Sequence, residues 1–168
     1  MRKENIVLIL WDECKNVFSS SNNKQLKVWL QQLLEIIKKY YDFFYEKVDL
    51  EFLKFVVKIS VDDYFVGTNG DDFELRAKSY IQQEIISIED IWVILSQLIW
   101  DLTVPVTNKV CPFCQCDNLV LLTDKNEKWI YEFCENCFWT SKDEIQIMRP
   151  DSLFPASKKL LEMNDYRL

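Results

Sequence analysis

Four cysteines in two close pairs are the residues of this 168-residue chain whose types and spacing predict a definite chemistry. The first pair is CPFC, from Cys111 to Cys114, and the second is CENC, from Cys134 to Cys137. A two-residue spacer lets the backbone turn so that both sulfurs reach one ion, and two such turns complete a tetrahedral shell of four thiolates. These four cysteines are therefore the predicted ligands of one metal ion.

The residues between the two pairs predict a β-hairpin. Residues 119–123 (LVLLT) and 129–133 (WIYEF) are rich in β-forming types, and the polar residues 124–127 (DKNE) separate them as a turn. The order of knuckle, strand, turn, strand and knuckle over residues 109–140 resembles the zinc-ribbon family. Pro112 matches the proline that is common in the first knuckle of that family. The resemblance implies a bound Zn²⁺.

Two residues depart from the zinc-ribbon pattern. Such knuckles often place glycine just after their second cysteine, where this chain has Gln115 and Phe138. Each of these residues must either accept a backbone conformation that favours glycine or change the turn. The departure therefore concerns the local geometry of the knuckles more than the identity of the ligands.

A shell of four cysteines predicts a structural rather than a catalytic ion, because catalytic zinc usually keeps one coordination position open for water. A thioredoxin-like redox pair is the rival interpretation of CPFC, but it requires a helix after a strand in a βαβ context, which the sequence does not indicate. A secreted disulfide framework is disfavoured because the chain is long enough to build a core without disulfides. Of the two remaining cysteines, Cys116 is a spare, and Cys14 is expected to be a buried thiol in the first helix.

The predicted fold class is mainly α, with an N-terminal helical domain, a C-terminal zinc-ribbon β-hairpin and a short terminal helix. The chain has only two glycines, and apolar residues recur at helical spacing through its first hundred residues. A continuous helix is expected over residues 25–48, and Ser87 with Asp90 forms a capping box for the last helix before Pro105. The expected segments are 1–103 for the helical domain, 104–148 for the ribbon and 149–168 for a linker with a helix near residues 156–164.

Negative charge is concentrated in one short segment. The chain has a net charge of −7, and residues 60–90 contain eight acidic against two basic residues. Two interpretations are open: the acids cap helices and solvate the surface, or they form a face that attracts a basic protein. The candidate partner-binding residues in this segment are Asp62, Asp63, Asp71, Asp72 and Glu74.

Several function classes are disfavoured by composition. Residues 104–140 contain three lysines against five acids, which is not the basic footprint of a module that binds nucleic acid directly. The chain has no histidine, the usual general base, and its two glycines are too few for a phosphate-binding loop. The apolar run near the N-terminus, Ile6–Trp11, is too short to cross a membrane, so a soluble cytoplasmic protein is expected.

These observations lead to one main functional hypothesis and two alternatives. The main hypothesis is a non-catalytic, acidic interaction protein with a structural zinc, most concretely a small inhibitor such as an immunity protein or antitoxin that blocks a basic, nuclease-like toxin. The first alternative is an accessory factor whose ribbon docks on the transcription or translation machinery. The second alternative is a metal-dependent hydrolase that uses clustered carboxylates such as Asp62 and Asp63.

Overall fold

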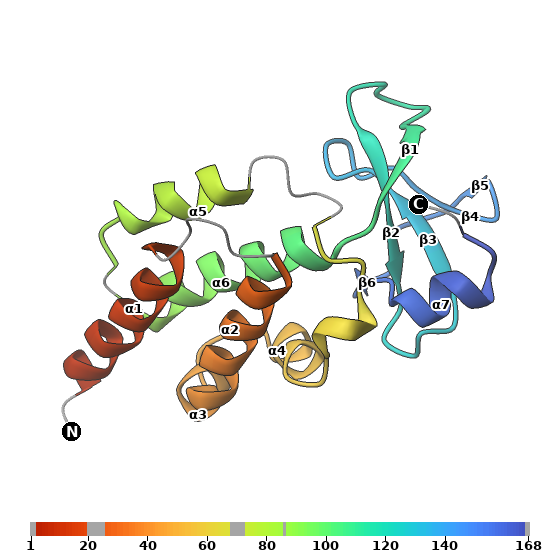
Figure 1. Ribbon diagram of the computed structural model, residues 1–168. Coiled ribbons are helices and arrows are strands. Elements are labelled where there is room, and N and C mark those ends of the chain that lie inside the picture. The colour runs from red at the N-terminus through yellow and green to blue at the C-terminus, as the bar shows by residue number, and fades with distance from the viewer. Residues whose placement is uncertain (1–2, 20–25, 68–72, 86, 167–168) are drawn as a thin grey trace. The chain divides into compact units, whose positions relative to one another are not determined.

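The chain forms two compact units in the computed structural model, which describes residues 3–19, 26–67, 73–85 and 87–166. The first unit comprises residues 1–61 and 70–102, and the second comprises residues 62–69 and 103–168. Helices of the first unit are α1 (Lys3–Ser19), α2 (Leu26–Lys39), α3 (Tyr41–Tyr45), α4 (Leu50–Val56), α5 (Phe73–Ile81) and α6 (Ile88–Thr103) (Figure 1). The 3₁₀ turn η1 (Val61–Asp63) lies where the chain first passes into the second unit.

The prediction of a mainly α fold is wrong. Helices make up 49% and strands 15% of the described residues, and the strands form one antiparallel six-stranded sheet, so the fold is mixed α/β. The strands are β1 (Val106–Val110), β2 (Asn118–Thr123), β3 (Ile130–Phe133), β4 (Thr140–Lys142), β5 (Ile145–Gln146) and β6 (Phe154–Pro155). Only β2 and β3 were expected. Strands β4, β5 and β6 have only two or three residues each, and β1 (VTNKV) has a polar centre, so pairing in the sheet contributes more to them than a local pattern does.

Side-chain caps begin two helices of the first unit, and one of them is the predicted capping box. The Asp49 side chain accepts a hydrogen bond from the Glu51 backbone N–H at 2.9 Å and so caps α4. At the start of α6, the Ser87 N–H donates to Asp90 Oδ2 at 2.9 Å, and the Asp90 N–H donates to Ser87 Oγ at 3.1 Å. This reciprocal pair is the predicted capping box, and it satisfies two backbone donors that the helix itself leaves unbonded.

The predicted continuous helix over residues 25–48 is divided at Tyr40. Helix α2 ends at Lys39, Tyr40 has φ −107° and ψ 20°, and α3 begins at Tyr41. No glycine or proline marks this break in the sequence. The Tyr40 hydroxyl instead donates to Glu13 Oε1 of α1 at 2.8 Å, a tertiary contact that the helical periodicity of one segment cannot predict.

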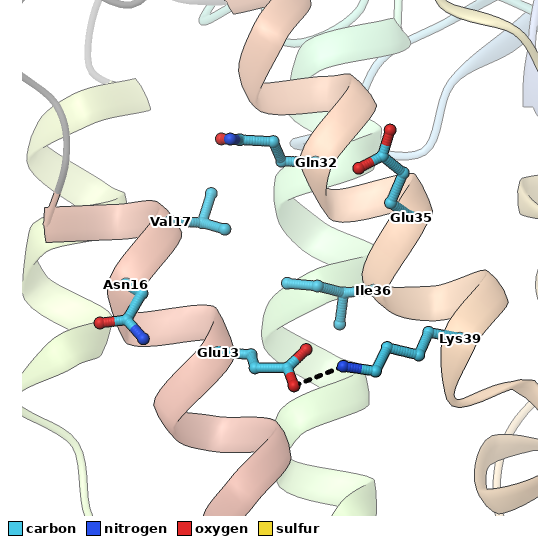
Figure 2. A pocket seen from close by; sticks show the side chains of 7 residues that line it. All are labelled: Glu13, Asn16, Val17, Gln32, Glu35, Ile36 and Lys39. Atoms are coloured by element: carbon cyan, nitrogen blue, oxygen red, sulfur yellow. Dashed lines mark hydrogen bonds and ion pairs between the residues drawn. The ribbon is translucent and has the colours of Figure 1, made fainter.

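Helices α1 and α2 pack through an aromatic contact and a polar contact. Phe18 of α1 lies 6.3 Å from Trp29 of α2 between ring centroids, and Trp29 in turn contacts Phe73 of α5 at 5.0 Å. Farther along the same two helices, Glu13 and Lys39 point toward each other across a small hollow, with Lys39 Nζ 2.6 Å from Glu13 Oε1 (Figure 2). The pKa of the Glu13 carboxyl is lowered, chiefly by this hydrogen bond from Lys39.

The sheet of the second unit has the strand order β1-β2-β3-β4-β5, and β6 pairs with β2 beyond the end of β1. Strands β2 and β3 form the predicted hairpin, with Val120 opposite Phe133 and Thr123 opposite Ile130. Its turn is closed by Asp124, whose Oδ1 accepts a hydrogen bond from the Asn126 N–H at 2.8 Å. The hairpin thus forms the centre of the sheet, and each of its outer ends continues into one cysteine knuckle.

A short helix, α7 (Lys158–Met163), packs on the sheet. Ser157 caps it by accepting a hydrogen bond from the Leu160 N–H. The apolar side chains of Leu160 and Leu161 are buried against Leu121 and Ile130 of the hairpin. The predicted terminal helix is therefore confirmed, and together with the hairpin it forms a small core at the end of the sheet away from the cysteines.

Candidate metal centre

The four predicted cysteines lie together at one end of the sheet. Their Sγ atoms are all within 4.8 Å of one another. The sulfurs of Cys111 and Cys137 are 3.6 Å apart, and those of Cys114 and Cys134 are also 3.6 Å apart. Four sulfurs at tetrahedral positions, each about 2.3 Å from a zinc ion, are separated by about 3.8 Å. The observed spacing therefore fits a four-coordinate zinc site, in agreement with the predicted ligand set.

Two knuckles with the same local geometry position the sulfurs. The first joins β1 to β2, and the second joins β3 to β4. In each knuckle the residue after the second cysteine donates its N–H to the carbonyl of the first cysteine: Gln115 to Cys111 at 3.0 Å, and Phe138 to Cys134 at 2.9 Å. Each turn thereby brings its two cysteines to the same side of the backbone.

Both residues that replace the usual glycine accept its conformation. The φ angles of Gln115 and Phe138 are 56° and 61°, in the left-handed region that costs a non-glycine residue about 1–2 kcal/mol. The turn is therefore kept and the local strain is tolerated, which is one of the two outcomes expected from the sequence. A metal ion bound to both cysteines of each knuckle would fix the turn and so explain why the strained backbone is kept.

Hydrogen bonding and burial shift the thiol pKa values of Cys114 and Cys134 in opposite directions. A hydrogen bond with the backbone of Cys116 is the main cause that lowers the pKa of Cys114, to about 7, whereas burial raises that of Cys134 to about 12. Cys111 and Cys134 are buried with Leu119 in a small cluster that also includes Trp139. Because zinc binds thiolates, loading the site releases protons, and metal affinity depends on pH.

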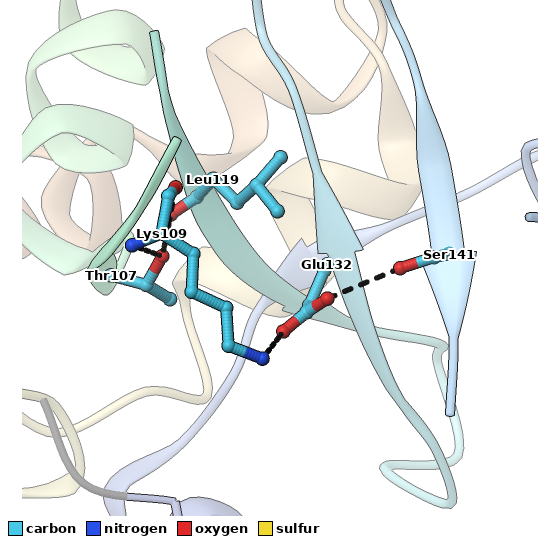
Figure 3. Close-up of polar contacts among 5 residues, drawn as sticks. All are labelled: Thr107, Lys109, Leu119, Glu132 and Ser141. Carbon is cyan, nitrogen blue, oxygen red and sulfur yellow. Dashed lines mark hydrogen bonds and ion pairs between the residues drawn. The ribbon is translucent and has the colours of Figure 1, made fainter. Parts of the chain in front are cut away.

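A polar network ties the strands that lead into the two knuckles (Figure 3). Lys109 Nζ of β1 donates to Glu132 Oε1 of β3 at 2.5 Å, and Ser141 Oγ of β4 donates to Glu132 Oε2 at 3.2 Å. The Thr107 hydroxyl donates to the Leu119 carbonyl at 2.9 Å, where the register of β1 against β2 is irregular. These contacts connect all four strands that carry the knuckles.

Lys109 and Glu132 were not identified from the sequence, although a signal for them was present. Lys109 stands two residues before Cys111, and Glu132 stands two residues before Cys134. Strands β1 and β3 both pair with β2, so residues at the same offset before the two knuckles lie near the same end of the sheet, where the long lysine side chain reaches the carboxylate across β2. The Glu132 carboxylate is buried, with 7% of the residue exposed, so its charge requires the partner that Lys109 supplies.

The remaining two cysteines lie outside the four-sulfur cluster. Cys14 is buried in α1, as predicted, and burial raises the pKa of its thiol to about 12. Cys116 is exposed, and its thiol donates to the Cys114 carbonyl at 3.1 Å. The raised pKa of Cys14 makes it a core thiol rather than a nucleophile at neutral pH.

The five candidate partner-binding residues do not form one described cluster. Asp62 and Asp63 are exposed in η1, in a segment that belongs to the second unit. Asp71 and Asp72 lie outside the described residues, and of Glu74 only its position in α5 is described. The acidic segment is thus shared between the two compact units.

The arrangement at the cysteines supports structural ligation. Soft thiolate ligands in a tetrahedral set suit zinc, and four of them complete its coordination shell. Within the described ranges, no other group of three or more Cys, Asp or Glu side chains is placed to hold a metal ion. In those same ranges, no helix combines the length and apolar character required to cross a bilayer.

Comparisons with known proteins were made at three levels. The scan against protein-family models, the search of curated proteins and the search of solved structures each gave no match to this chain.

Proposed function

We propose that this protein is a non-catalytic interaction protein whose second unit is stabilised by one structural Zn²⁺. The observation that carries the proposal is the cysteine cluster, in which two pairs of sulfurs lie 3.6 Å apart at the ends of two matching knuckles. A closed four-thiolate shell organises backbone and leaves no coordination position for a substrate. The activity of such a protein lies in the surfaces that the metal holds in place.

A basic protein is the partner class that the charge distribution supports. Residues 60–90 carry a net charge of −6, and Arg76 is one of only two basic residues among them. Arg76 Nη1 lies 3.0 Å from Asp101 Oδ2, and the Asp101 side chain is 3% exposed. Because this arginine neutralises a buried carboxylate in its own unit, it compensates little of the segment's negative charge. A segment with such a net negative charge increases the rate of association with a protein of opposite charge.

The most specific form of the proposal is a small inhibitor, such as an immunity protein or antitoxin, that blocks a basic toxin. It is supported by the size of the chain, its acidity and its lack of histidine. The test is to tag the protein in its own host, identify what co-purifies, and measure the binding of that partner at increasing salt concentration. Association driven by opposite charges slows steeply with added salt, while dissociation changes less.

A charge-neutralised variant tests the acidic segment directly. Changing Asp71, Asp72 and Glu74 to Asn, Asn and Gln preserves side-chain shape and much of the capping ability, and we expect at least about tenfold weaker association with the partner. The matched control changes three acids of the second unit in the same way: Asp143, Glu144 and Asp165. Equal affinities of both folded variants and the natural protein, with no salt response, would refute the role of this segment.

A second candidate function is supported by the exposed rings on the knuckles. Phe113 is 73% exposed and Phe138 is 61% exposed, although both belong to the turns that hold the metal ligands. Large exposed apolar side chains at a rigid site are frequent anchors in protein interfaces. This observation favours an accessory factor whose ribbon docks on a large assembly. In that case the protein co-sediments with ribosomes or polymerase, and Phe113→Ser abolishes co-sedimentation.

A further inference from the structure

An aromatic groove lies between α4 and α6 of the first unit. The groove has a volume of about 220 Å³. Trp92, Ser96 and Trp100 are four residues apart on α6, so they lie in one row along the helix. The small Ser96 between two indoles leaves a hollow, which Phe52 of α4 borders from the side. The full lining is Asp49, Phe52, Trp92, Ser96, Gln97 and Trp100.

The aromatic rings of the groove make it attractive to a cation. Phe52 lies 6.0 Å from Trp92 and 6.2 Å from Trp100 between ring centroids, with interplanar angles of 66° and 51°. Trp92 is buried with 7% of the residue exposed, whereas Phe52 and Trp100 are half-buried, so Phe52 and Trp100 supply most of the ring surface that a ligand can reach. The face of an aromatic ring is negative and attracts cations, and tryptophan does so most strongly.

A carboxylate at the rim adds a full negative charge. Asp49 is exposed, and one of its oxygens caps α4 by accepting the Glu51 N–H. The cap uses Oδ1, so Oδ2 remains available to a ligand. The lysine nearest in sequence, Lys47, is paired with Glu89 at 3.8 Å. The groove thus combines aromatic surfaces with a carboxylate, a combination that is complementary to a positively charged group.

The size and shape of the groove indicate what kind of cation fits. Pockets that bind small molecules usually have volumes of about 300–1,000 Å³. A groove of about 220 Å³ is smaller and suits a single side chain. A guanidinium is planar, stacks on aromatic rings and donates two parallel hydrogen bonds to a carboxylate, whereas an ammonium is a strongly hydrated point charge.

We propose that the groove between α4 and α6 binds the guanidinium of an arginine side chain presented by a protein partner. The guanidinium plane stacks on the half-buried rings of Trp100 and Phe52 above the buried indole of Trp92, and Asp49 Oδ2 accepts an N–H. The inference rests on the proposed function only in assuming that the partner is basic. It specifies which basic side chain is recognised and where it is bound, on α4 and α6 of the first unit.

A titration of the full-length protein with short capped peptides tests this assignment without knowledge of the partner. The probes are N-acetyl-Gly-Arg-Gly-amide, its lysine counterpart, and its citrulline counterpart, which has nearly the same shape as arginine but no charge. The readout is the set of tryptophan indole N–H signals in ¹⁵N–¹H NMR spectra, assigned with single Trp→Phe variants. We expect the arginine peptide to shift the Trp92 and Trp100 signals saturably and to bind at least about fivefold more tightly than the lysine and citrulline peptides.

Two groove variants with matched controls make the test specific. Asp49→Asn removes the charge and keeps a good helix cap, so the fold is retained and arginine binding is expected to weaken at least about fivefold. Ser96→Leu fills the hollow and is expected to abolish the indole shifts. The control Asp12→Asn removes an exposed acid of α1. The control Ser79→Leu replaces an exposed α5 serine that, like Ser96, donates its hydroxyl to the carbonyl three residues earlier.

Three results of the peptide titration would overturn the inference. They are the absence of saturable shifts at Trp92 and Trp100, equal binding of the citrulline or lysine peptide, and unchanged arginine binding in a folded Asp49→Asn variant. None of these results bears on zinc or on the acidic segment, because the probe experiment does not use the partner. Salt-sensitive capture of a basic partner that is unaffected by Asp49→Asn would refute the groove and leave the proposed function in place.

Discussion

Replacing Lys109 by methionine tests whether the ion pair beside the knuckles stabilises the ribbon. The variant keeps the aliphatic part of the side chain but leaves the buried Glu132 carboxylate with Ser141 as its hydrogen-bond partner. Breaking a buried ion pair costs about 3–5 kcal/mol, whereas an exposed pair contributes about 0–1 kcal/mol. The Glu132 side chain is 9% exposed and that of Lys109 is 53% exposed, so the pair falls between these limits.

We therefore expect Lys109→Met to lower the free energy of unfolding of the second unit by about 1–2 kcal/mol. Amide hydrogen exchange of β2 and β3 measures this change in the sheet itself. If folding of the ribbon is coupled to metal binding, apparent zinc affinity in competition with a chelator should fall by about 5–30-fold.

Comparing the stability of a double variant with that of Lys109→Met shows whether the loss comes from an unpaired buried charge or from lost packing. The double variant Lys109→Met with Glu132→Gln has no charge at position 132, so it should be more stable than Lys109→Met alone. Lys125→Met, in the exposed hairpin turn, serves as the control and should have little effect. The reasoning is refuted if the double variant is less stable than the single one, or if the two lysine variants are equivalent.

Three further predictions follow from other parts of the chain. Gln115→Gly should stabilise the ribbon by about 0.5–1 kcal/mol relative to Gln115→Ala, because only glycine adopts φ 56° without a steric cost; hydrogen exchange of the ribbon measures the difference. Glu13→Gln should destabilise the protein at pH 7 but have little effect at about pH 3. The pKa of Glu13 in the folded protein lies below its ordinary value of 4.5. The ionised carboxylate therefore stabilises the fold above pH 4.5, and this stabilisation is lost as the pH falls through the folded-state pKa. Denaturant unfolding at both pH values measures the difference. Iodoacetamide should alkylate Cys116 in the folded protein and leave Cys14 unmodified until unfolding, since Cys14 is buried with a pKa of about 12; peptide mass spectrometry locates the label.

The metal site was predictable because its signals are local. The spacing of the two CxxC pairs and the β-forming residues between them predicted the ligands and the hairpin, and both expectations agree with the structure. The missing glycines at Gln115 and Phe138 also indicated where the backbone would be strained. Capping residues predicted helix starts for the same reason, since a cap acts on the next few residues of its own helix.

The other features depend on contacts between distant parts of the chain. Strands β5 and β6 have two residues each, too few for any periodicity, and they exist because β4 and β2 offer backbone partners. The break at Tyr40 coincides with its hydrogen bond to Glu13, which is 27 residues away. The Lys109–Glu132 pair likewise requires β1 and β3 to pair with β2, one on each side. Patterns within a single segment do not contain this information.

Metal content and coordination are the most direct test of the central claim that the four cysteines hold one structural zinc ion. The measurement is elemental analysis combined with zinc X-ray absorption on protein purified under reducing conditions, for the natural chain and for Cys14→Ala. The account predicts one zinc per chain in both proteins, bound by four sulfurs at about 2.3 Å. Protein that folds and contains no zinc, a shell that includes oxygen ligands, or loss of zinc in Cys14→Ala would contradict it.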